Sequence, residues 1–285
     1  MAELTTHRKI ALAKTLRAVV MLGRRACGRG ADAQVRRMGI QWQLDLNEGI
    51  DFAIYILGGF ELRTLRLYRS LVRPGDTVLD IGANVGAHTL PLAQLVGPTG
   101  RIIAFEPTRF AFEKLQRNLM LNPELVSRVT LQQVALMESA TASVPAHIYS
   151  SWPLDTQESL HAVHGGQLQD TDGAAAQTLD QVVESTGVAR VDFVKLDVDG
   201  HEPQVLAGAL GTLRRFKPKI LIEWAPYLFE GRDSLLDPAL EALRSLGYRA
   251  RVAGRNAVGE VPRHRNDLFV SMPHGSSINL LLESA

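Results

Sequence analysis

Four polar side chains near the ends of two apolar runs have the residue types that acid–base chemistry needs. Lys195, Asp197 and His201 stand close together in the chain, and Glu223 closes the next apolar run. Lys195 and Asp197 are two residues apart, so they would share one face of a strand. A lysine inside such a strand is costly to bury unless a carboxylate pairs with it. His201 has the unperturbed pKa best suited to a base near neutral pH. These four residues are therefore the candidate catalytic groups.

A glycine-rich turn follows another apolar run and has the composition of a ligand-binding turn. The run Thr77–Ile81 contains Asp80, and Gly82, Asn84 and Gly86 follow at alternate positions. We expect a buried strand, then this turn, then a helix. Such a turn lets a ligand approach the backbone and meet the amides at the start of the helix. A dinucleotide-binding fingerprint would instead read G-x-G-x-x-G.

Glu106 is the candidate for contact with a ribose. It ends the apolar run Arg101–Phe105 and lies 24 residues after Gly82 (106 − 82). An acidic residue about 20 residues beyond a glycine-rich turn, at the end of a strand, can accept both ribose hydroxyls. The alternative is an exposed strand-end charge, and the preceding turn makes us favour ribose binding.

Two motifs resemble those of one family. The turn, DIGANVG at residues 80–86, resembles the S-adenosylmethionine (SAM) loop of class I methyltransferases and is most similar to that of FkbM-type O-methyltransferases. The stretch from Asp192 to Glu202 resembles the family's D-x-x-K-x-D-x-E-G-x-E motif, with Asp199 where glutamate is usual. The resemblance covers about residues 35–270 and implies SAM as the cofactor.

The resemblance also implies roles for single residues. Glu61 would cap the cofactor pocket, and Ala135 would flank the adenine. From its place at the carboxyl edge of the sheet, and apart from the resemblance, we expect Asp197 to orient the amino acid portion of the cofactor or the base. Without the resemblance, Glu61 is a carboxylate favoured at a helix N-terminus, and Ala135 is a core residue. The candidate cofactor-binding residues are Glu61, Asp80, Gly82, Asn84, Gly86, Glu106, Ala135 and Asp197.

Strand and helix patterns alternate along the chain. They predict an α/β sheet with helices on both faces and a ligand beyond the carboxyl ends of the strands. The resemblance implies a Rossmann-like, seven-stranded, mostly parallel sheet of order 3-2-1-4-5-7-6. We expect the last two strands at 248–252 and 267–271. We divide the chain into a basic N-terminal extension (1–34), a hairpin and helix lead-in (35–72), a SAM-dependent methyltransferase domain (73–275) and a C-terminal tail (276–285).

The composition is that of an ordinary globular protein. Of 285 residues, 46% are hydrophobic and 21% are charged. The single cysteine, Cys27, cannot form an internal disulfide, which favours a reducing, cytoplasmic setting. No apolar run approaches the roughly 18 residues of a spanning helix. The run 18–22 is shorter than the core of a signal peptide, about 7–15 residues, so we expect no export.

Charge is distributed unevenly, although the net charge is only +1. Residues 1–40 carry nine basic residues against Glu3 and Asp32. Such an arm suits contact with an anionic membrane surface; the alternative is a solvated, partly helical tail. The sequence leaves open whether the chain forms a homodimer.

Residues 138–177 show little periodicity and hold Trp152, His161 and His164. A segment of this length without clear structure is usually a functional or a disordered loop. These three residues are candidates for a lid over the acceptor, although histidines in a polar loop are more often inert, and we expect the segment to set substrate choice.

We interpret the chain as a SAM-dependent O-methyltransferase that acts on a hydroxyl of a sugar, glycolipid or polyketide-like small molecule. An NAD-type oxidoreductase is disfavoured because the turn lacks the middle glycine. A metal-dependent methyltransferase is disfavoured because no Asp-Asn pair ends the fifth strand, and we expect no metal. Nucleic acid is a poor acceptor because no Asn/Asp-Pro-Pro-aromatic motif follows strand four. A non-catalytic module that binds SAM or a partner stays open.

Overall fold

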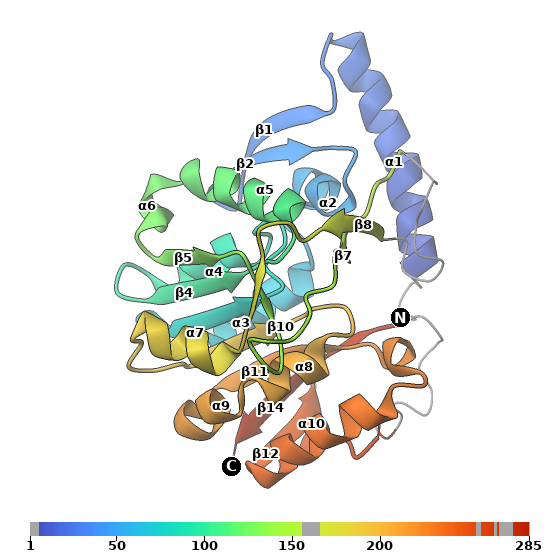
Figure 1. Ribbon diagram of the computed structural model, residues 1–285. Coiled ribbons are helices and arrows are strands. Elements are labelled where there is room, and N and C mark those ends of the chain that lie inside the picture. The colour runs from blue at the N-terminus through green and yellow to red at the C-terminus, as the bar shows by residue number, and fades with distance from the viewer. Residues whose placement is uncertain (1–5, 156–165, 255–257, 265–266, 268–275, 285) are drawn as a thin grey trace.

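The computed structural model describes residues 6–155, 166–254, 258–264, 267 and 276–284. Within these residues a large mixed β-sheet is covered by helices on both faces (Figure 1). The predicted α/β architecture is therefore confirmed. His161 and His164, which we expected in an acceptor lid, lie outside the described residues.

The central sheet has eight strands, in the order β13-β12-β14-β11-β10-β3-β4-β5. Strands β11, β10, β3, β4 and β5 are parallel neighbours, whereas β14, β12 and β13 are joined antiparallel. The predicted number of seven strands is wrong, because β13 extends the sheet at the edge beyond β12. The strands are β3 (Thr77–Ile81), β4 (Arg101–Phe105), β5 (Val129–Gln132), β10 (Phe193–Leu196), β11 (Lys219–Trp224), β12 (Tyr248–Val252), β13 (Val258–Glu260) and β14 (Ile278–Ser284).

The two sequence motifs meet at the centre of this sheet. Strands β3 and β10 are parallel neighbours, and Asp80 lies opposite Lys195 in their register. From β3 the chain goes on to β4 on one side, and from β10 it goes on to β11 on the other. This is the point at which the strand order reverses, where open α/β sheets bind ligands.

The sheet is buried on both faces, because successive residues of its strands enter different apolar clusters. Val78 and Ile102 pack with residues of α2 to α6, whereas Leu79 and Ile103 pack with residues of α7 to α10. Continuous apolar strands of this kind are typical of parallel sheets covered on both sides. The helices are α2 (Gly49–Leu57), α3 (Leu62–Leu71), α4 (Thr89–Val96), α5 (Arg109–Met120), α6 (Pro123–Val126), α7 (Leu179–Thr186), α8 (Glu202–Ala207), α9 (Leu210–Phe216) and α10 (Asp233–Ser245), with a 3-10 turn η1 (Pro226–Phe229).

The chain before β3 forms a helix, a hairpin and two further helices. Helix α1 (Thr6–Ala26) stands at the edge of the molecule and contacts α2 (Figure 1). The hairpin of β1 (Asp32–Arg37) and β2 (Ile40–Asp45) turns at Met38 and Gly39, both of which have positive φ. Asp51 of α2 is fully buried and accepts a hydrogen bond from Lys114 of α5 at 2.6 Å. This pair ties the lead-in to the main sheet.

Residues 138–177 contain more structure than their composition predicts. Strands β7 (His147–Ser151) and β8 (Gln167–Asp170) form an antiparallel hairpin, and β6 (Val134–Leu136) pairs with β9 (Ala175–Gln177). Strand β7 is held at one end by the Asn84 side-chain amide, which donates to the Ser150 carbonyl at 3.0 Å. Just beyond this end of the strand, the Trp152 backbone amide donates to the Glu48 carboxylate at 3.1 Å. The hairpin thus covers the glycine-rich turn.

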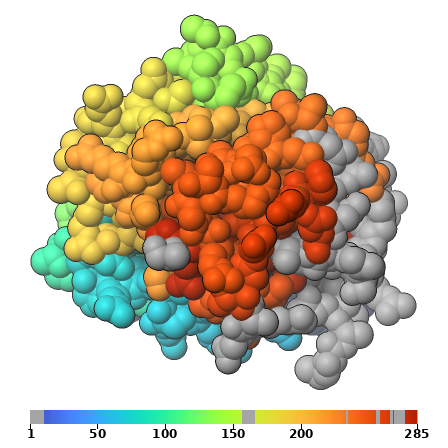
Figure 2. Space-filling model, turned by 90° about the horizontal axis from the view of Figure 1, so that it is seen from below, coloured from blue at the N-terminus to red at the C-terminus, as the bar shows by residue number. Residues whose placement is uncertain are grey.

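The end of the chain belongs to the sheet. Residues 276–284 contain β14, which lies between β11 and β12, rather than the tail that we expected. Most of the other expected closing strand, 267–271, lies outside the described residues. The C-terminal part of the chain, orange to red, covers the middle of the face in Figure 2. Among the described helices, none combines the length and the apolar composition that crossing a bilayer requires.

Candidate active site

Lys195 joins the two motifs. Its ammonium group donates to the Gly82 carbonyl at 2.8 Å and lies 3.1 Å from Asp197 Oδ2 and 3.8 Å from Asp80 Oδ1. Burial alone would lower the pKa of Lys195, but the carboxylates of Asp197 and Asp80 outweigh it and raise the pKa above its usual range. Lys195 is therefore a fixed cation beneath the turn, and it cannot act as a base near neutral pH.

The glycines of the turn allow protein segments to pack closely. A Cβ on Gly82 would lie 1.8 Å from the Asp197 carbonyl oxygen, and a Cβ on Gly86 would lie 2.7 Å from Leu115 Cδ1. Both glycines have positive φ, as does Asn84. We expected glycine here to let a ligand approach the backbone. The structure shows a further reason for glycine: Gly82 admits the segment after β10, and Gly86 admits α5.

Asp80 lies behind the turn. Its carboxylate is fully buried and accepts a hydrogen bond from Thr89 Oγ1 at 2.6 Å. Burial raises the pKa of Asp80, and Lys195 and the Thr89 hydroxyl counter that effect. Asp80 therefore fixes the turn to α4 and to Lys195.

Glu106 is buried, so it is not an exposed strand-end charge. Its Oε2 accepts the Asn84 amide at 2.9 Å, and its Oε1 accepts the Thr108 amide at 3.0 Å and the Thr108 hydroxyl at 2.5 Å. Burial raises the pKa of Glu106, and the bonds from Thr108 and Asn84 counter it. A carboxylate offers about four lone-pair positions, which leaves room on Oε2 for a further donor.

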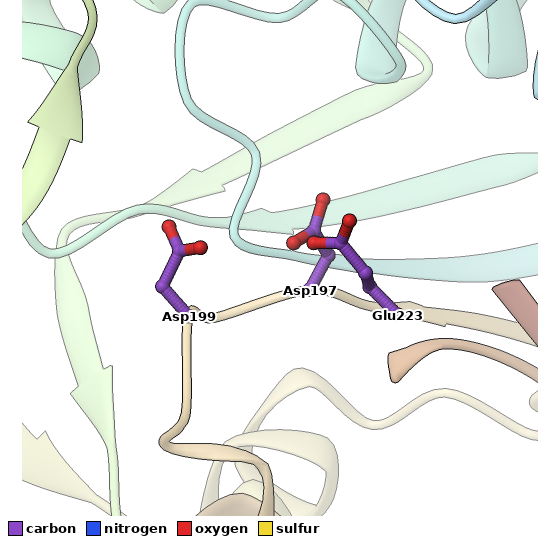
Figure 3. A group of neighbouring side chains, drawn as sticks. All are labelled: Asp197, Asp199 and Glu223. Atoms are coloured by element: carbon purple, nitrogen blue, oxygen red, sulfur yellow. The ribbon is translucent and has the colours of Figure 1, made fainter. Parts of the chain in front are cut away.

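Three carboxyl groups gather beyond the ends of β10 and β11. Asp197, Asp199 and Glu223 offer oxygen atoms that lie within 4.8 Å of one another. Figure 3 shows the carboxyl groups of Asp197 and Glu223 side by side, with that of Asp199 next along the chain. Asp199 has a left-handed backbone, with φ 48°. Such strain in a non-glycine residue persists only where the surroundings enforce it and is frequent at functional sites.

These three carboxyl groups differ in protonation. Burial would raise the pKa of Asp197, but the charge of Lys195 outweighs it and lowers the pKa. Burial, and then the charge of Asp197, raise the pKa values of Asp199 and Glu223 well above the usual range. Glu223 shares a hydrogen bond with Asp197 and accepts one from Ser277 Oγ at 2.5 Å. The cluster therefore consists of one carboxylate paired with Lys195 and two carboxyl groups whose pKa values are raised by burial and by Asp197, and an additional cation nearby would counter that rise.

A cavity of about 660 Å³ opens onto this cluster and onto Glu106. That volume lies in the range of about 300–1,000 Å³ found for small-molecule sites. The candidate residues that line it are Glu61, Gly82, Asn84, Glu106, Ala135, Lys195, Asp197, His201 and Glu223. Its lining, as far as the described residues define it, does not include Asp80 or Gly86. The structure thus brings nine of the eleven candidates to one cavity.

His201 is the neutral base candidate in this cavity. Burial lowers the pKa of His201, and the charge of Arg232 lowers it further. Its imidazole is therefore unprotonated near neutral pH. Glu61, another residue that lines the cavity, directly precedes α3 in the lead-in. Its backbone has φ 47°, and its carboxylate accepts a hydrogen bond from Thr64 Oγ1 at 3.0 Å.

His88 is a cavity residue that the sequence reasoning missed. Its Nδ1 lies 3.0 Å from the Tyr68 hydroxyl, and its Nε2 lies 3.9 Å from Glu61 Oε2. Burial lowers the pKa of His88 to about 3, with Lys195 as the next cause, so the ring is neutral. Within the described residues, Nε2 has no hydrogen-bond partner. The available signal was its place two residues after the glycine-rich turn.

The comparisons with known proteins point to one family. The profile of the family described as "Methyltransferase FkbM domain" matches residues 80–250. The hexuronic acid methyltransferase AglP of Haloferax volcanii is 28% identical over 157 residues, which cover 54% of this chain and 58% of that protein. The 31-O-demethyl-FK506 methyltransferase FkbM of Streptomyces tacrolimicus is 31% identical over 159 residues, covering 48% of this chain and 60% of that protein.

The chain thus aligns with less than two thirds of the length of either of these curated relatives. Among solved structures, a Methyltransferase FkbM from Methylobacillus flagellatus KT has a TM-score of 0.45 at 19% identity, and the match covers 76% of this chain and 50% of that one.

Proposed function

This chain belongs to the FkbM methyltransferase family, and from that premise we propose that it transfers a methyl group from SAM to a hydroxyl group of a sugar or polyketide-like small molecule. The observation that carries the proposal is the position of Lys195, which joins the glycine-rich turn to the acidic segment after β10 at one cavity. The names of two relatives, a hexuronic acid methyltransferase and a 31-O-demethyl-FK506 methyltransferase, support the acceptor class.

The chemistry of the cavity fits SAM. Glu106 is a buried carboxylate with room for a hydroxyl donor, which suits a ribose. The cluster of Asp197, Asp199 and Glu223 is rich in acidic groups near a single lysine, which suits a cationic ligand. Ala135 is buried at the cavity wall, where an adenine would find apolar contact. Glu61 and His88 stand together and would meet the amino acid end.

Bound SAM would supply the electrophilic methyl group; the chain must position the acceptor and take its proton. We assign the proton to His201, because its neighbours are unsuited to this step. Lys195 stays protonated, the Asp197 carboxylate is paired with Lys195, and burial and Asp197 raise the pKa of Glu223. His201 is neutral near pH 7 and lines the same cavity.

We further propose a division of labour along the chain. The part of the chain from β3 to β14 supplies the base and most of the groups that would hold the cofactor; the lead-in 35–72 contributes Glu61, and the extension 1–34 and α2 shape the entrance, because α1 and α2 both line the cavity. The single cysteine, Cys27, favours a reducing compartment such as the cytoplasm. Homodimer formation is a separate expectation, which light scattering on the full chain would test.

Isothermal calorimetry tests the proposal directly. SAM and S-adenosylhomocysteine should bind the purified chain with micromolar dissociation constants, and NAD should not bind. Binding of NAD without binding of SAM would contradict methyl transfer and revive an oxidoreductase. Binding of SAM without transfer to any hydroxylated acceptor would favour a non-catalytic SAM-binding module.

A further inference from the structure

Helix α1 carries an apolar stripe on its outer side. Leu12, Leu16, Val19 and Leu22 have exposed fractions of 61%, 40%, 65% and 73%. Their spacing of four, three and three residues places them on one side of the helix. The inner side of the helix is apolar as well, since Met21 is buried in the core. We call these four exposed residues the α1 stripe.

The α1 stripe continues into the mouth of the cavity. Leu12 and Leu16 are exposed and also line the cavity. Leu57 of α2, which is 61% exposed, lines the cavity as well. Phe60 adds to the apolar lining and contacts the buried ring of His88, with ring centroids 6.0 Å apart. The entrance to the candidate active site is therefore apolar, although its far end is acidic.

The same helix lies at the basic pole of the protein. From Leu4 to Ala31 the chain holds seven basic residues and no acidic residue. Residues 1–40 carry a net charge of +7, whereas the remainder, with 22 basic and 28 acidic residues, carries −6. An anionic surface would attract this pole and repel the rest of the molecule, so it would orient the molecule with α1 toward the surface.

We propose that the α1 stripe docks on an anionic lipid surface, and that the acceptor is an amphiphile whose hydroxylated head enters the cavity from that surface. A helix that exposes an apolar stripe within a basic segment lies in the interface of such a bilayer. Nucleic acid would match the basic residues but would leave the apolar stripe in water. Pairing of two α1 helices would cover the stripe but would bring together two arms of charge +7.

The docking stands on the surface of α1 alone, whereas the acceptor class rests on the proposed methyl transfer. Docking is tested by flotation of the full chain with phosphatidylcholine vesicles that contain about a third phosphatidylglycerol, a composition that gives an anionic surface. We expect binding to these vesicles at low salt, weaker binding at high salt, and little binding to pure phosphatidylcholine. Failure to bind the anionic vesicles would overturn the docking.

Val19→Glu has a matched control in Met120→Glu. Both residues lie on helices and are 65% exposed, but Met120 belongs to α5, and neither lines the cavity. Val19→Glu should weaken vesicle binding about tenfold or more, because an apolar contact is lost and a negative charge is added. Met120→Glu should leave it unchanged. Equal vesicle binding by the two variants would overturn the docking. So would a wild-type chain that forms a dimer and binds no vesicles, if Val19→Glu dissociates that dimer.

Calorimetry with SAM separates this inference from the proposed function. Both variants should bind SAM as the wild type does. A chain that binds SAM but no vesicles contradicts the docking alone, whereas one that binds vesicles but no SAM contradicts the methyl transfer. To test the acceptor class, the chain is incubated with methyl-labelled SAM and an extract of the cells that naturally produce the protein, which supplies candidate acceptors. Label in the chloroform–methanol phase is expected; label confined to the aqueous phase, or in neither phase, would overturn that part.

Discussion

Glu106→Gln tests the cofactor end of the site, because the substitution removes the charge and almost none of the volume. The wild-type carboxylate accepts the Asn84 amide on one oxygen and the Thr108 amide on the other. A glutamine can present its single oxygen to only one of these backbone N–H groups, so the other loses its acceptor. A buried donor without a partner costs about 1–3 kcal/mol. The urea midpoint of the variant should therefore fall.

Glu106→Gln should also weaken the binding of SAM, and by more than a substitution far from the cavity does. Hydrogen bonds to a charged group contribute about 1.5–3 kcal/mol, which corresponds to a dissociation constant raised about tenfold to a hundredfold. Calorimetry measures this constant. Glu124→Gln, at an exposed position of α6, is the matched control and should change neither quantity. A Glu106→Gln variant that keeps wild-type affinity for SAM would refute ribose binding by Glu106.

Three further predictions concern other parts of the structure. Burial raises the pKa of Glu202 to about 7, so the native state holds its proton more tightly than the unfolded state. The stabilisation from this proton is present below pH 4.5 and is lost as pH rises toward 7. By urea unfolding, the free energy of unfolding of Glu202→Gln should match that of the wild type at pH 4.5 and exceed it by about 3 kcal/mol at pH 8. His201→Ala should lower kcat by about 10²–10⁴ and remove the acid limb of the pH–rate profile, with SAM affinity unchanged; a nearly silent variant would contradict the assignment of the proton to His201. Lys114→Met should destabilise the fold by about 3–5 kcal/mol, because it leaves Asp51 buried without its cation, and a loss below 1 kcal/mol would contradict that.

The sequence predicted the central part of the site because that part depends on local patterns. Residues at the ends of adjacent parallel strands must meet at one edge, and this places Glu106, Lys195 and Asp197 near the glycine-rich turn. Asp80 belongs to the same turn, but its side chain points to Thr89 and Lys195 and away from the cavity. Spacing along the chain identifies the turn and does not determine which side of it each carboxylate faces.

The outer part of the site depends on contacts between distant segments, which no local period records. Ser150 contacts Asn84 and Thr108, and next to it Glu48 ties the C-terminal end of β7 to the start of α2. Likewise, β14 joins the sheet between β11 and β12, although a short apolar run at the end of a chain predicts a tail as readily as a strand. The sequence alone does not indicate which part of the fold β7 and β14 pack against.

The acidic cluster leads to a last prediction, about protons released on binding. Without a cationic ligand, Asp199 and Glu223 keep their protons to a higher pH than ordinary carboxyl groups do. SAM carries a sulfonium and an ammonium group, and a nearby cation lowers the pKa of a carboxyl group. If the amino acid end of SAM lies at Asp197, binding should therefore release protons to the buffer.

Calorimetry between pH 5 and 8, in pairs of buffers that differ in ionisation enthalpy, measures that release. S-adenosylhomocysteine lacks the sulfonium charge and should release fewer protons than SAM at the same pH. Glu223→Gln should reduce the release for both ligands, because the glutamine amide has no proton to lose in this range. A binding heat that does not depend on the buffer would mean that the charge of SAM lies away from the cluster. In that case Asp197 would not hold the amino acid end of the cofactor, and Lys195 would be its structural partner alone.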